Sequence, residues 1–283
     1  AFHYTTTVNN YLDADTYKII KGDSDEDTEY FKSDFTSDEE RESYEAELCA
    51  QVEAEGAALL KNQNAALPLA QGAKVSLFGH GSVDLMYGGT GSGSVDTSKA
   101  PNFKQALEDQ GIQVNSTLWD LYSSDDMMKN YSRITPAAIS DTLEANTQYA
   151  VNEAPWSKLS SAESSFADYG DAAIVVFSRS GGEGADLSYG EVNYLALDEN
   201  EKAMLQNVAE MKKNGTVKKT ILLINSANAL QVDFLKNNEY DIDAALWIGD
   251  VGISGINAVA EILTGKVNPS GSLVDTYCYD NFS

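Results

Sequence analysis

Short unbroken apolar runs constrain the fold of this chain more than any other feature of its sequence. The clearest are Ala172–Phe177 (AAIVVF), Thr220–Ile224 (TILLI) and Ala244–Ile248 (AALWI). A strand that is apolar at every position is buried on both faces, which is typical of a parallel sheet covered by helices. The sequence therefore predicts an α/β fold in which these three runs are central strands.

Helical patterns alternate with these runs and with shorter ones. Asp198 and Glu201 give one helix a start signal, and in another helix Tyr44, Leu48 and Val52 share one face. The predicted helices cover residues 37–56, 101–111, 198–211 and 256–265. The predicted shorter strands are Ala57–Leu60, Lys74–Phe78 and Leu273–Tyr277.

The acidic charge of the chain disfavours several kinds of partner. Asp and Glu outnumber Lys and Arg by 44 to 19, and residues 1–55 alone hold 16 acidic and 4 basic side chains. Such a surface repels nucleic acid and anionic lipid but suits neutral ligands such as sugars. No apolar run approaches the roughly 18 residues of a membrane span. We expect an acidic leader segment over residues 1–36 and one α/β domain over residues 37–283.

Cysteine and histidine are too few for a metal site. Cys49 and Cys278 are far apart and match no metal-ligand spacing, and His3 and His80 are the two histidines of the sequence. We expect two buried free thiols rather than a disulfide, and neither a metal nor a cofactor. No signal peptide is visible at Ala1, which leaves secreted, cell-surface and cytoplasmic locations in a bacterium open.

Two glycine-rich loops each follow a predicted strand. Gly88–Ser94 (GGTGSGS) comes after Lys74–Phe78, and Ser178–Asp186 (SRSGGEGAD) comes after Ala172–Phe177. In open parallel sheets, ligands bind beyond the carboxyl ends of the strands, so we expect both loops at or near one edge. Glycines let the backbone approach a ligand closely. Nucleotide binding is disfavoured, because a phosphate-binding loop needs a lysine after its glycines and none stands there.

The second loop places a glutamate among glycines. Glu183 lies between Gly182 and Gly184, with Arg179 and Asp186 nearby. A general acid that has to move towards a substrate would have such a frame, because glycines allow the loop to change its backbone angles. On this segment alone, an ordinary surface loop is the simpler interpretation.

Together, four segments resemble the sandwich domain of family 3 glycoside hydrolases, the group that includes many bacterial and fungal β-glucosidases and β-xylosidases. In family order they are Glu55–Leu69 (EGAALLKNQNAALPL), Gly88–Val95 (GGTGSGSV), Ser180–Asp186 (SGGEGAD), and the stretch from Ala244 through Asn257–Ala260 to Asn268–Leu273 (NPSGSL). The sequence departs from the family at Leu187, where arginine is frequent, and at Gly249–Gly255, which lacks the usual proline and acidic pair. These departures bear on the substrate rather than on the family.

The resemblance implies a fold, and it implies that two domains share the catalytic residues. It implies a six-stranded, mostly parallel sheet with helices on both faces, and a partner TIM-like barrel that carries the aspartate nucleophile. Glu183 would be the catalytic acid/base, while Ser92, Thr90, Gly91 and Arg179 would contact the substrate. The chain would be the sandwich domain of a retaining β-glycosidase that hydrolyses terminal non-reducing β-linked sugars, inactive without its barrel.

Residues 1–36 bear on where the barrel lies in the parent protein. A barrel needs about 250 residues, and residues 1–36 do not resemble the barrel helix that leads into the sandwich in the commoner domain order. We therefore expect the barrel after Ser283 in the parent protein. The alternative function is a non-catalytic carbohydrate-binding or scaffolding module, which the intact Glu183 and its glycines argue against. The sugar, its linkage and the oligomeric state stay open.

Overall fold

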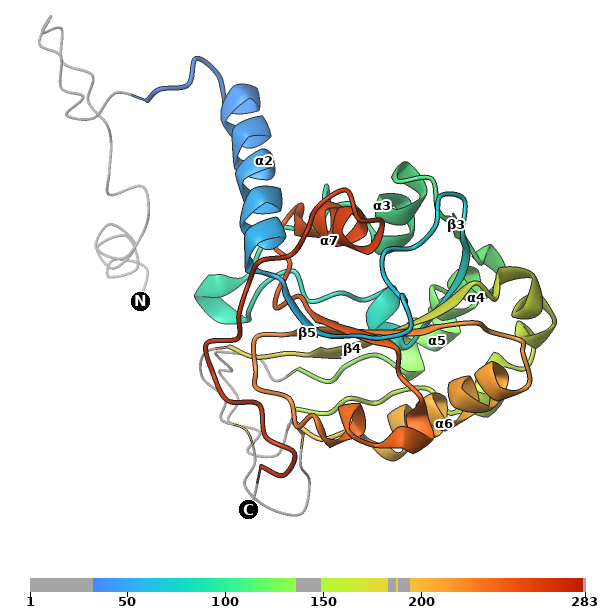
Figure 1. Cartoon of the computed structure of the whole chain (residues 1–283). Helices are drawn as coiled ribbons and strands as arrows, with labels where there is room; N and C mark the ends of the chain where they lie inside the picture. Colours follow the sequence, from blue (N-terminus) through green and yellow to red (C-terminus); the bar gives the residue numbers. More distant parts are fainter. Residues whose placement is uncertain (1–32, 136–148, 183–186, 188–193, 282–283) are drawn as a thin grey trace, which may run out of the picture. The chain divides into compact units, whose positions relative to one another are not determined.

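The computed structural model describes residues 33–135, 149–182, 187 and 194–281 (Figure 1). The chain divides into two compact units, Ala1–Arg41 and Glu42–Ser283. The second unit contains the sheet and is described here by itself. Within the described ranges, no helix combines the length and the hydrophobicity that crossing a membrane requires.

A six-stranded sheet forms the centre of the larger unit, with the strand order β1-β6-β5-β4-β2-β3. The strands are β1 (Ala58–Asn62), β2 (Lys74–Phe78), β3 (Gln113–Val114), β4 (Ala172–Arg179), β5 (Thr220–Ser226) and β6 (Ala244–Trp247). All neighbouring pairs are parallel except β1 with β6. The predicted mostly parallel sheet is confirmed, and the three apolar runs are interior strands with a neighbour on each side.

Helices cover both faces of the sheet (Figure 1). The covering helices are α3 (Phe103–Asp109), α4 (Ser116–Tyr122), α5 (Asp125–Asn130), α6 (Glu199–Lys213) and α7 (Gly255–Leu263). Helix α2 (Asp38–Gly56) has no buried residue and leads into β1. Side chains alternate along each strand, so Ile174 and Val176 pack with α3 and α7, whereas Val175 and Phe177 pack with α4, α5 and α6. The two cores therefore lie on opposite faces of one sheet.

The longest ladder of the sheet joins β4 and β5 and sets the geometry of the carboxyl edge. It runs from the pair Ala173–Thr220 to the pair Arg179–Ser226, and every residue of both strands is buried. The ladder between β2 and β4 stops earlier, where Phe78 pairs with Val175. The last residues of β4 therefore extend past the end of β2. The segment that follows β2 lies next to these last residues.

Local signals in the sequence explain where helix α6 starts. The Asp198 carboxylate accepts a hydrogen bond from the Glu201 amide at 2.7 Å, and the Glu201 carboxylate accepts one from the Asp198 amide at 2.9 Å. This reciprocal capping satisfies two backbone donors that the first turn of a helix leaves without partners. Met204, Val208 and Met211 are buried and form the inner face of this helix.

One prediction about the secondary structure is wrong. Leu273–Tyr277 contains no strand, and Val274 is 97% exposed. The segment alternates like a strand, but an extended segment needs a neighbour with free backbone groups along its length. Here the tail makes separated backbone contacts, from Gly271 to Ala57 and from Val232 to Cys278. The sixth strand is instead β3, which has two residues and gives no periodic signal.

The apolar face that Tyr44, Leu48 and Val52 share on helix α2 is largely exposed. Tyr44, Leu48 and Val52 are 51%, 45% and 63% exposed. The contacts lie on the opposite side of the helix, where the Ser254 hydroxyl donates to the Ala46 carbonyl at 2.6 Å. Small and polar side chains on that side let the helix approach the loop that precedes α7.

The two cysteines are free, as predicted, but their burial differs from the prediction. Cys49 is partly buried, and Cys278 is exposed. The Cys49 thiol lies 3.7 Å from the Val251 carbonyl oxygen. Cys278 lies in the tail that forms no strand, so no second layer of structure covers it.

Candidate active-site edge

The carboxyl edge of the sheet is organised by an asparagine at the end of β5. The Asn225 carboxamide accepts a hydrogen bond from the Met86 amide at 2.6 Å and donates to the Met86 carbonyl at 3.0 Å. It also donates to the Gly249 carbonyl at 2.7 Å. One buried side chain thus fixes the segment that leads to the first glycine-rich loop and the segment that follows β6. Asn225 gave no motif signal beyond being polar at the end of an apolar strand.

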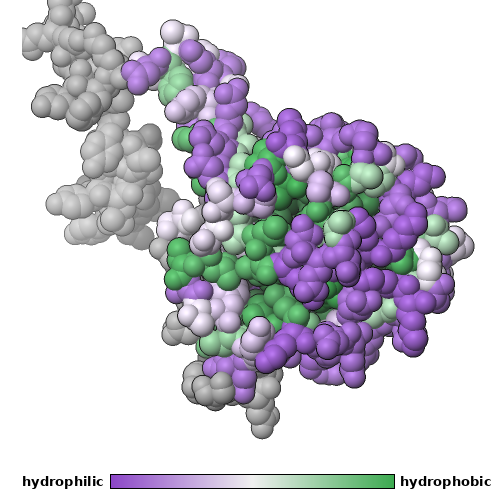
Figure 2. All heavy atoms as spheres, viewed as in Figure 1, coloured by the Kyte–Doolittle hydropathy of each residue, from purple (hydrophilic) through white to green (hydrophobic). Residues whose placement is uncertain are grey.

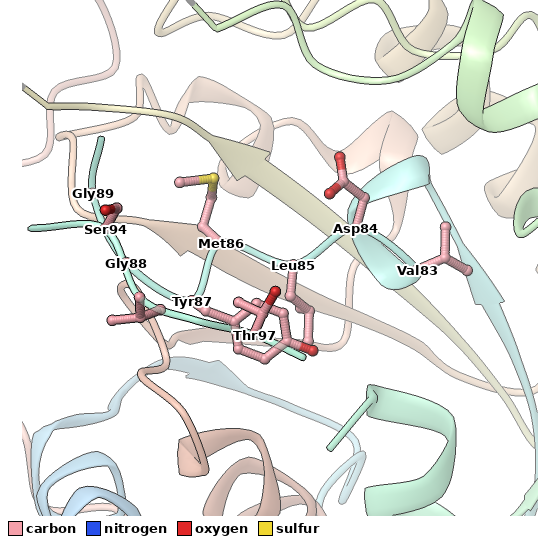
Figure 3. A pocket seen from close by; sticks show the side chains of 10 residues that line it. Val83, Asp84, Leu85, Met86, Tyr87, Gly88, Gly89, Ser94 and Thr97 are labelled. Atoms are coloured by element: carbon pink, nitrogen blue, oxygen red, sulfur yellow. The ribbon is translucent and has the colours of Figure 1, made fainter. Parts of the chain in front are cut away.

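An open hollow of about 350 Å³ lies beside the segment that enters the first loop (Figure 3). Asp84 and Met86 project to one side of this segment, and Leu85 and Tyr87 project to the other (Figure 3). Leu85 belongs to the core on the α3 and α7 side of the sheet. Alternation therefore anchors one row of side chains in the core and directs the other row towards the strand ends.

The two glycine-rich loops are hydrogen-bonded to each other. The Thr90 amide donates to the Gly181 carbonyl at 3.0 Å, and Thr90 forms a parallel bridge with Gly182. A methyl group added at Gly182 would lie 1.7 Å from the Thr90 hydroxyl oxygen. Only glycine allows this approach, because any side chain would separate the loops. The prediction that Gly88–Ser94 lies near the second loop is confirmed at Gly181 and Gly182.

Three side chains hold the base of the second loop through Ser180. The Ser180 amide donates to the Tyr194 hydroxyl at 2.7 Å, and the Asn228 carboxamide donates to the Ser180 carbonyl at 3.0 Å. The hydroxyls of Ser180 and Thr135 lie 2.7 Å apart. Sequence reasoning missed all three partners, because they come from segments that are remote in the chain.

The predicted acid/base residue follows directly after this anchored base. Glu183 and Asp186 lie outside the described residues. Ser180 is 1% exposed, whereas Gly182 is exposed. The chain therefore reaches the surface one residue before Glu183, from a backbone that is fixed by hydrogen bonds.

The predicted substrate contacts of the first loop lie at the surface of this edge. Thr90 and Gly91 are partly buried and Ser92 is exposed. Gly91 has a φ of 73°, in the left-handed region that favours glycine. These positions leave backbone and hydroxyl groups of the loop accessible to a ligand.

Arg179 is not placed to bind substrate, contrary to the prediction. Its side chain is 0% exposed, and both terminal nitrogens lie 2.8 Å from the Glu201 carboxylate. Its remaining N–H groups donate to the carbonyls of Tyr194, Ser178 and Ala196. Burial alone would lower the pKa of Arg179, but the Glu201 carboxylate raises it above its usual value. The guanidinium has used all its donors, and it fastens β4 to α6.

The fold and this edge define a class of domain: an open, mostly parallel α/β sandwich whose carboxyl edge carries two joined glycine-rich loops. The model of the Glycosyl hydrolase family 3 C-terminal domain matches residues 57–281. The chain therefore belongs to glycosyl hydrolase family 3. It is similar to a β-glucosidase of Ruminococcus albus, with 31% identity over 237 residues, which are 83% of this chain and 23% of that protein.

Other relatives support the same assignment. β-Glucosidase A of Butyrivibrio fibrisolvens is 32% identical over 254 residues, covering 82% of this chain and 28% of that protein. The solved structure of β-glucosidase 3B from Thermotoga neapolitana in complex with glucose matches 85% of this chain and 32% of its own, with 26% identity and a TM-score of 0.68. A β-glucosidase from Paenibacillus barengoltzii matches with 28% identity over 83% of this chain and 24% of its own, with a TM-score of 0.68. The chain spans less than a third of each of these relatives.

Proposed function

We propose that this chain is the sandwich domain of a retaining β-glycosidase that removes terminal non-reducing β-linked sugars, and that Glu183 is its acid/base. The hydrogen bond from Thr90 to Gly181 carries the proposal. It joins the proposed sugar-contacting loop to the backbone two residues before Glu183, so that a sugar held by the first loop lies within reach of the carboxyl group.

The proposed mechanism needs two carboxyl groups about 5–5.5 Å apart. Glu183 first protonates the leaving oxygen and then activates a water molecule against the glycosyl-enzyme. The nucleophilic aspartate comes from a TIM-like barrel elsewhere in the parent protein. When both domains close around a sugar, desolvation and the second carboxylate raise the pKa of Glu183, which keeps it protonated for the first step.

Exposed apolar side chains next to the loops support a partner at this edge. Val95 follows the first loop and is 39% exposed. Ile134 precedes Thr135, whose hydroxyl is hydrogen-bonded to Ser180, and is 44% exposed. Apolar groups gathered at the surface mark interaction sites. Figure 2 shows hydrophobic residues gathered over the middle of the larger unit, beside a strongly hydrophilic region.

We place the sandwich domain at residues 37–283, after an acidic leader over residues 1–36.

The roles of the loop residues follow from their chemistry. Ser92 and Thr90 offer hydroxyl groups that donate to or accept from sugar hydroxyls, and Gly91 lets the backbone approach the ring. Sugars are neutral, so the negative charge of the chain does not oppose their binding. No metal or cofactor takes part in this scheme.

Substitution of Glu183 in the parent enzyme tests the proposal. Glu183→Ala should reduce kcat by a factor of about 10²–10⁴ for substrates with poor leaving groups. Activated aryl glycosides leave without protonation and should lose far less, and azide should partly restore turnover by replacing the water. Glu191→Ala removes the next glutamate in the chain, eight residues later, and serves as the control. Equal losses on both substrates without azide rescue would contradict the assignment.

The isolated chain provides a second test. Purified as 283 residues, it should not hydrolyse aryl β-glycosides, because it lacks the proposed nucleophile. Sustained turnover by this chain alone would contradict the two-domain mechanism. A non-catalytic sugar-binding module would instead bind sugar, while Glu183→Ala in the parent protein would leave turnover unchanged.

A further inference from the structure

A buried arginine lies between the two glycine-rich loops. The Arg133 side chain is 7% exposed, and one terminal nitrogen lies 3.0 Å from the Asp84 carboxylate. The other terminal nitrogen donates to the Asp84 carbonyl and to the Ser178 hydroxyl, the latter at 2.5 Å. One guanidinium thus contacts the segment after β2 and the carboxyl end of strand β4 at the same time.

Both contacts lie close to where the loops start, one just before the first loop and one at the first residue of the second. Asp84 precedes Gly88 by four residues, and Ser178 precedes Gly182 by four residues. Figure 3 shows that Asp84 points to the side of its segment away from the core-facing Leu85. Arg133 therefore joins the two loops at their starting points, whereas the bond from the Thr90 amide joins them at their middles.

The segment of Arg133 also reaches the second loop directly. Two residues after Arg133, the Thr135 hydroxyl lies 2.7 Å from the Ser180 hydroxyl. Ile134 between them pairs with Ala150 through two backbone hydrogen bonds, of 2.9 and 3.1 Å. The arginine is therefore held on a backbone that is itself anchored.

The charge is costly at this place, which argues for a role beyond packing. Burial lowers the pKa of Arg133, Asp84 and Asp250 oppose this, and the neighbouring Arg179 adds to it. Within the described residues, Arg133 Nε is buried without a hydrogen-bond partner. Buried ion pairs are often replaceable by apolar side chains without loss of stability. Stability alone therefore gives little reason for a guanidinium between the loops.

We propose that Arg133 is a positioning residue: it holds the two glycine-rich loops in one register, so that Glu183 stands over the sugar that the first loop contacts. This inference rests on the proposed function. Arg133 itself does not touch the substrate, because its side chain is buried and directed at Asp84 and Ser178.

Hydrogen exchange in the full 283-residue chain tests the structural half of the inference. Arg133→Lys keeps the charge beside Asp84, but an ammonium cannot copy the fork of a guanidinium. Ser178→Ala removes the second contact by deleting one oxygen. Both should accelerate exchange of the Thr90 amide about tenfold or more relative to the Leu222 amide in the core. An unchanged ratio in both variants would overturn the proposal, and Ser178→Ala decides if Arg133→Lys does not fold.

A matched control removes a buried ion pair at the other end of the sheet. Lys212 is 15% exposed in its side chain and lies 2.7 Å from Asp243. Lys212→Met should lower global stability without changing the ratio of Thr90 to Leu222 exchange. A ratio that rose as much in Lys212→Met as in Ser178→Ala would show that the loops respond to stability alone, and would overturn the proposal.

Kinetics in the parent enzyme test the functional half. Arg133→Lys and Ser178→Ala should reduce kcat about 10- to 100-fold for poor leaving groups, because a misplacement near 1 Å has such effects. The loss should be smaller for activated aryl glycosides. If Glu183→Ala behaves as an acid/base variant while both positioning variants match the wild type, this inference fails alone. If Glu183→Ala shows no dependence on the leaving group, the proposed function fails instead.

Discussion

The two ends of the sheet place their carboxyl groups in opposite environments. At the amino end, hydrogen bonds from Lys218 and the Lys74 amide lower the pKa of Asp171. At the carboxyl end, burial raises the pKa of Glu53 to about 8 and also raises that of Asp250. The amino-end carboxylate is paired, whereas Glu53 and Asp250 each have one buried oxygen without a hydrogen-bond partner in the described part of the chain.

The paired carboxylate at the amino end stabilises the fold, whereas the carboxyl groups at the other end are buried without complete pairing. Buried polar atoms are nearly always hydrogen-bonded, so exceptions call for an explanation. Perturbed carboxyl groups also gather at functional sites. Here Glu53 and Asp250, the two carboxyl groups with an unpaired buried oxygen in the described residues, lie at the end of the sheet where the loops join and where ligands bind in open parallel sheets. The proposed site therefore lies at the end of the sheet whose buried carboxyl groups are less completely paired.

The largest expected effect comes from the fully hydrogen-bonded ion pair of Arg179 and Glu201 at the carboxyl end. Arg179→Met leaves the Glu201 carboxylate buried without its partner, and should lower the free energy of unfolding by about 3–5 kcal/mol. Urea unfolding of the 283-residue chain measures this.

The double variant Arg179→Met with Glu201→Leu sharpens the test. It removes both charges, so it should be more stable than Arg179→Met alone, because no unpaired charge remains buried. Losses that simply add would contradict the view that this pair acts as one unit joining β4 to α6.

A smaller effect is expected at Glu53, and it depends on pH. Its pKa is raised from 4.5 to about 8 in the fold, so its contribution is complete below pH 4.5 and is lost as the pH rises to about 8. The wild-type chain should lose stability between pH 5.5 and 8.5. Glu53→Gln should abolish this decline and be more stable than the wild type at pH 8.5 by roughly 1–3 kcal/mol.

Thermal unfolding across this pH range checks the prediction. Glu55→Gln, two residues along the same helix, is the control, because Glu55 is exposed. The two variants should respond differently to pH. If Glu53→Gln lost stability between pH 5.5 and 8.5 as the wild type does, Glu53 would not be the cause of this loss.

Next comes the contact between the loops. Gly182→Ala places a methyl group 1.7 Å from the Thr90 hydroxyl oxygen, so one loop has to move, at a cost of about 1–2 kcal/mol. Gly93→Ala is the matched control, because nothing lies within 4 Å of an added methyl group there. In the parent enzyme, Gly182→Ala should reduce kcat and Gly93→Ala should not. Equal kinetics would show that the contact has no catalytic consequence.

The sequence predicted the parts of this fold that depend on local patterns. The interior strands β4, β5 and β6 are unbroken apolar runs, and helix α6 begins at its capping residues. The tail at Leu273–Tyr277 had a strand-like alternation, but whether a strand forms depends on a free neighbouring edge. Strand β3 is too short to show any period.

At the proposed site, too, local patterns predicted some features, and contacts between distant segments determined the others. The two loops could be placed at one edge, because each follows a parallel strand. Arg179 looked like a loop residue since the apolar run ends at Phe177, but the ladder continues to Arg179. Side chains alternate, so Arg179 faces the same side as Phe177, towards α6. Arg133 comes from a segment with no periodic pattern, and only the fold brings it between the loops.

The smallest expected effect lies at the amino end and has the opposite pH dependence to Glu53. Burial alone would raise the pKa of Asp243, but hydrogen bonds from Lys212, Asn64 and the Thr220 amide lower it overall. Its contribution is therefore complete above pH 4 and is lost as the pH falls through the lowered value. Asp243→Asn should cost about 1 kcal/mol at pH 7, and urea unfolding should show that this difference from the wild type shrinks in acid. Asp171→Asn, which breaks the more exposed pair with Lys218, should cost less. If Asp243→Asn lost more stability in acid than at pH 7, the two ends of the sheet would not differ as described.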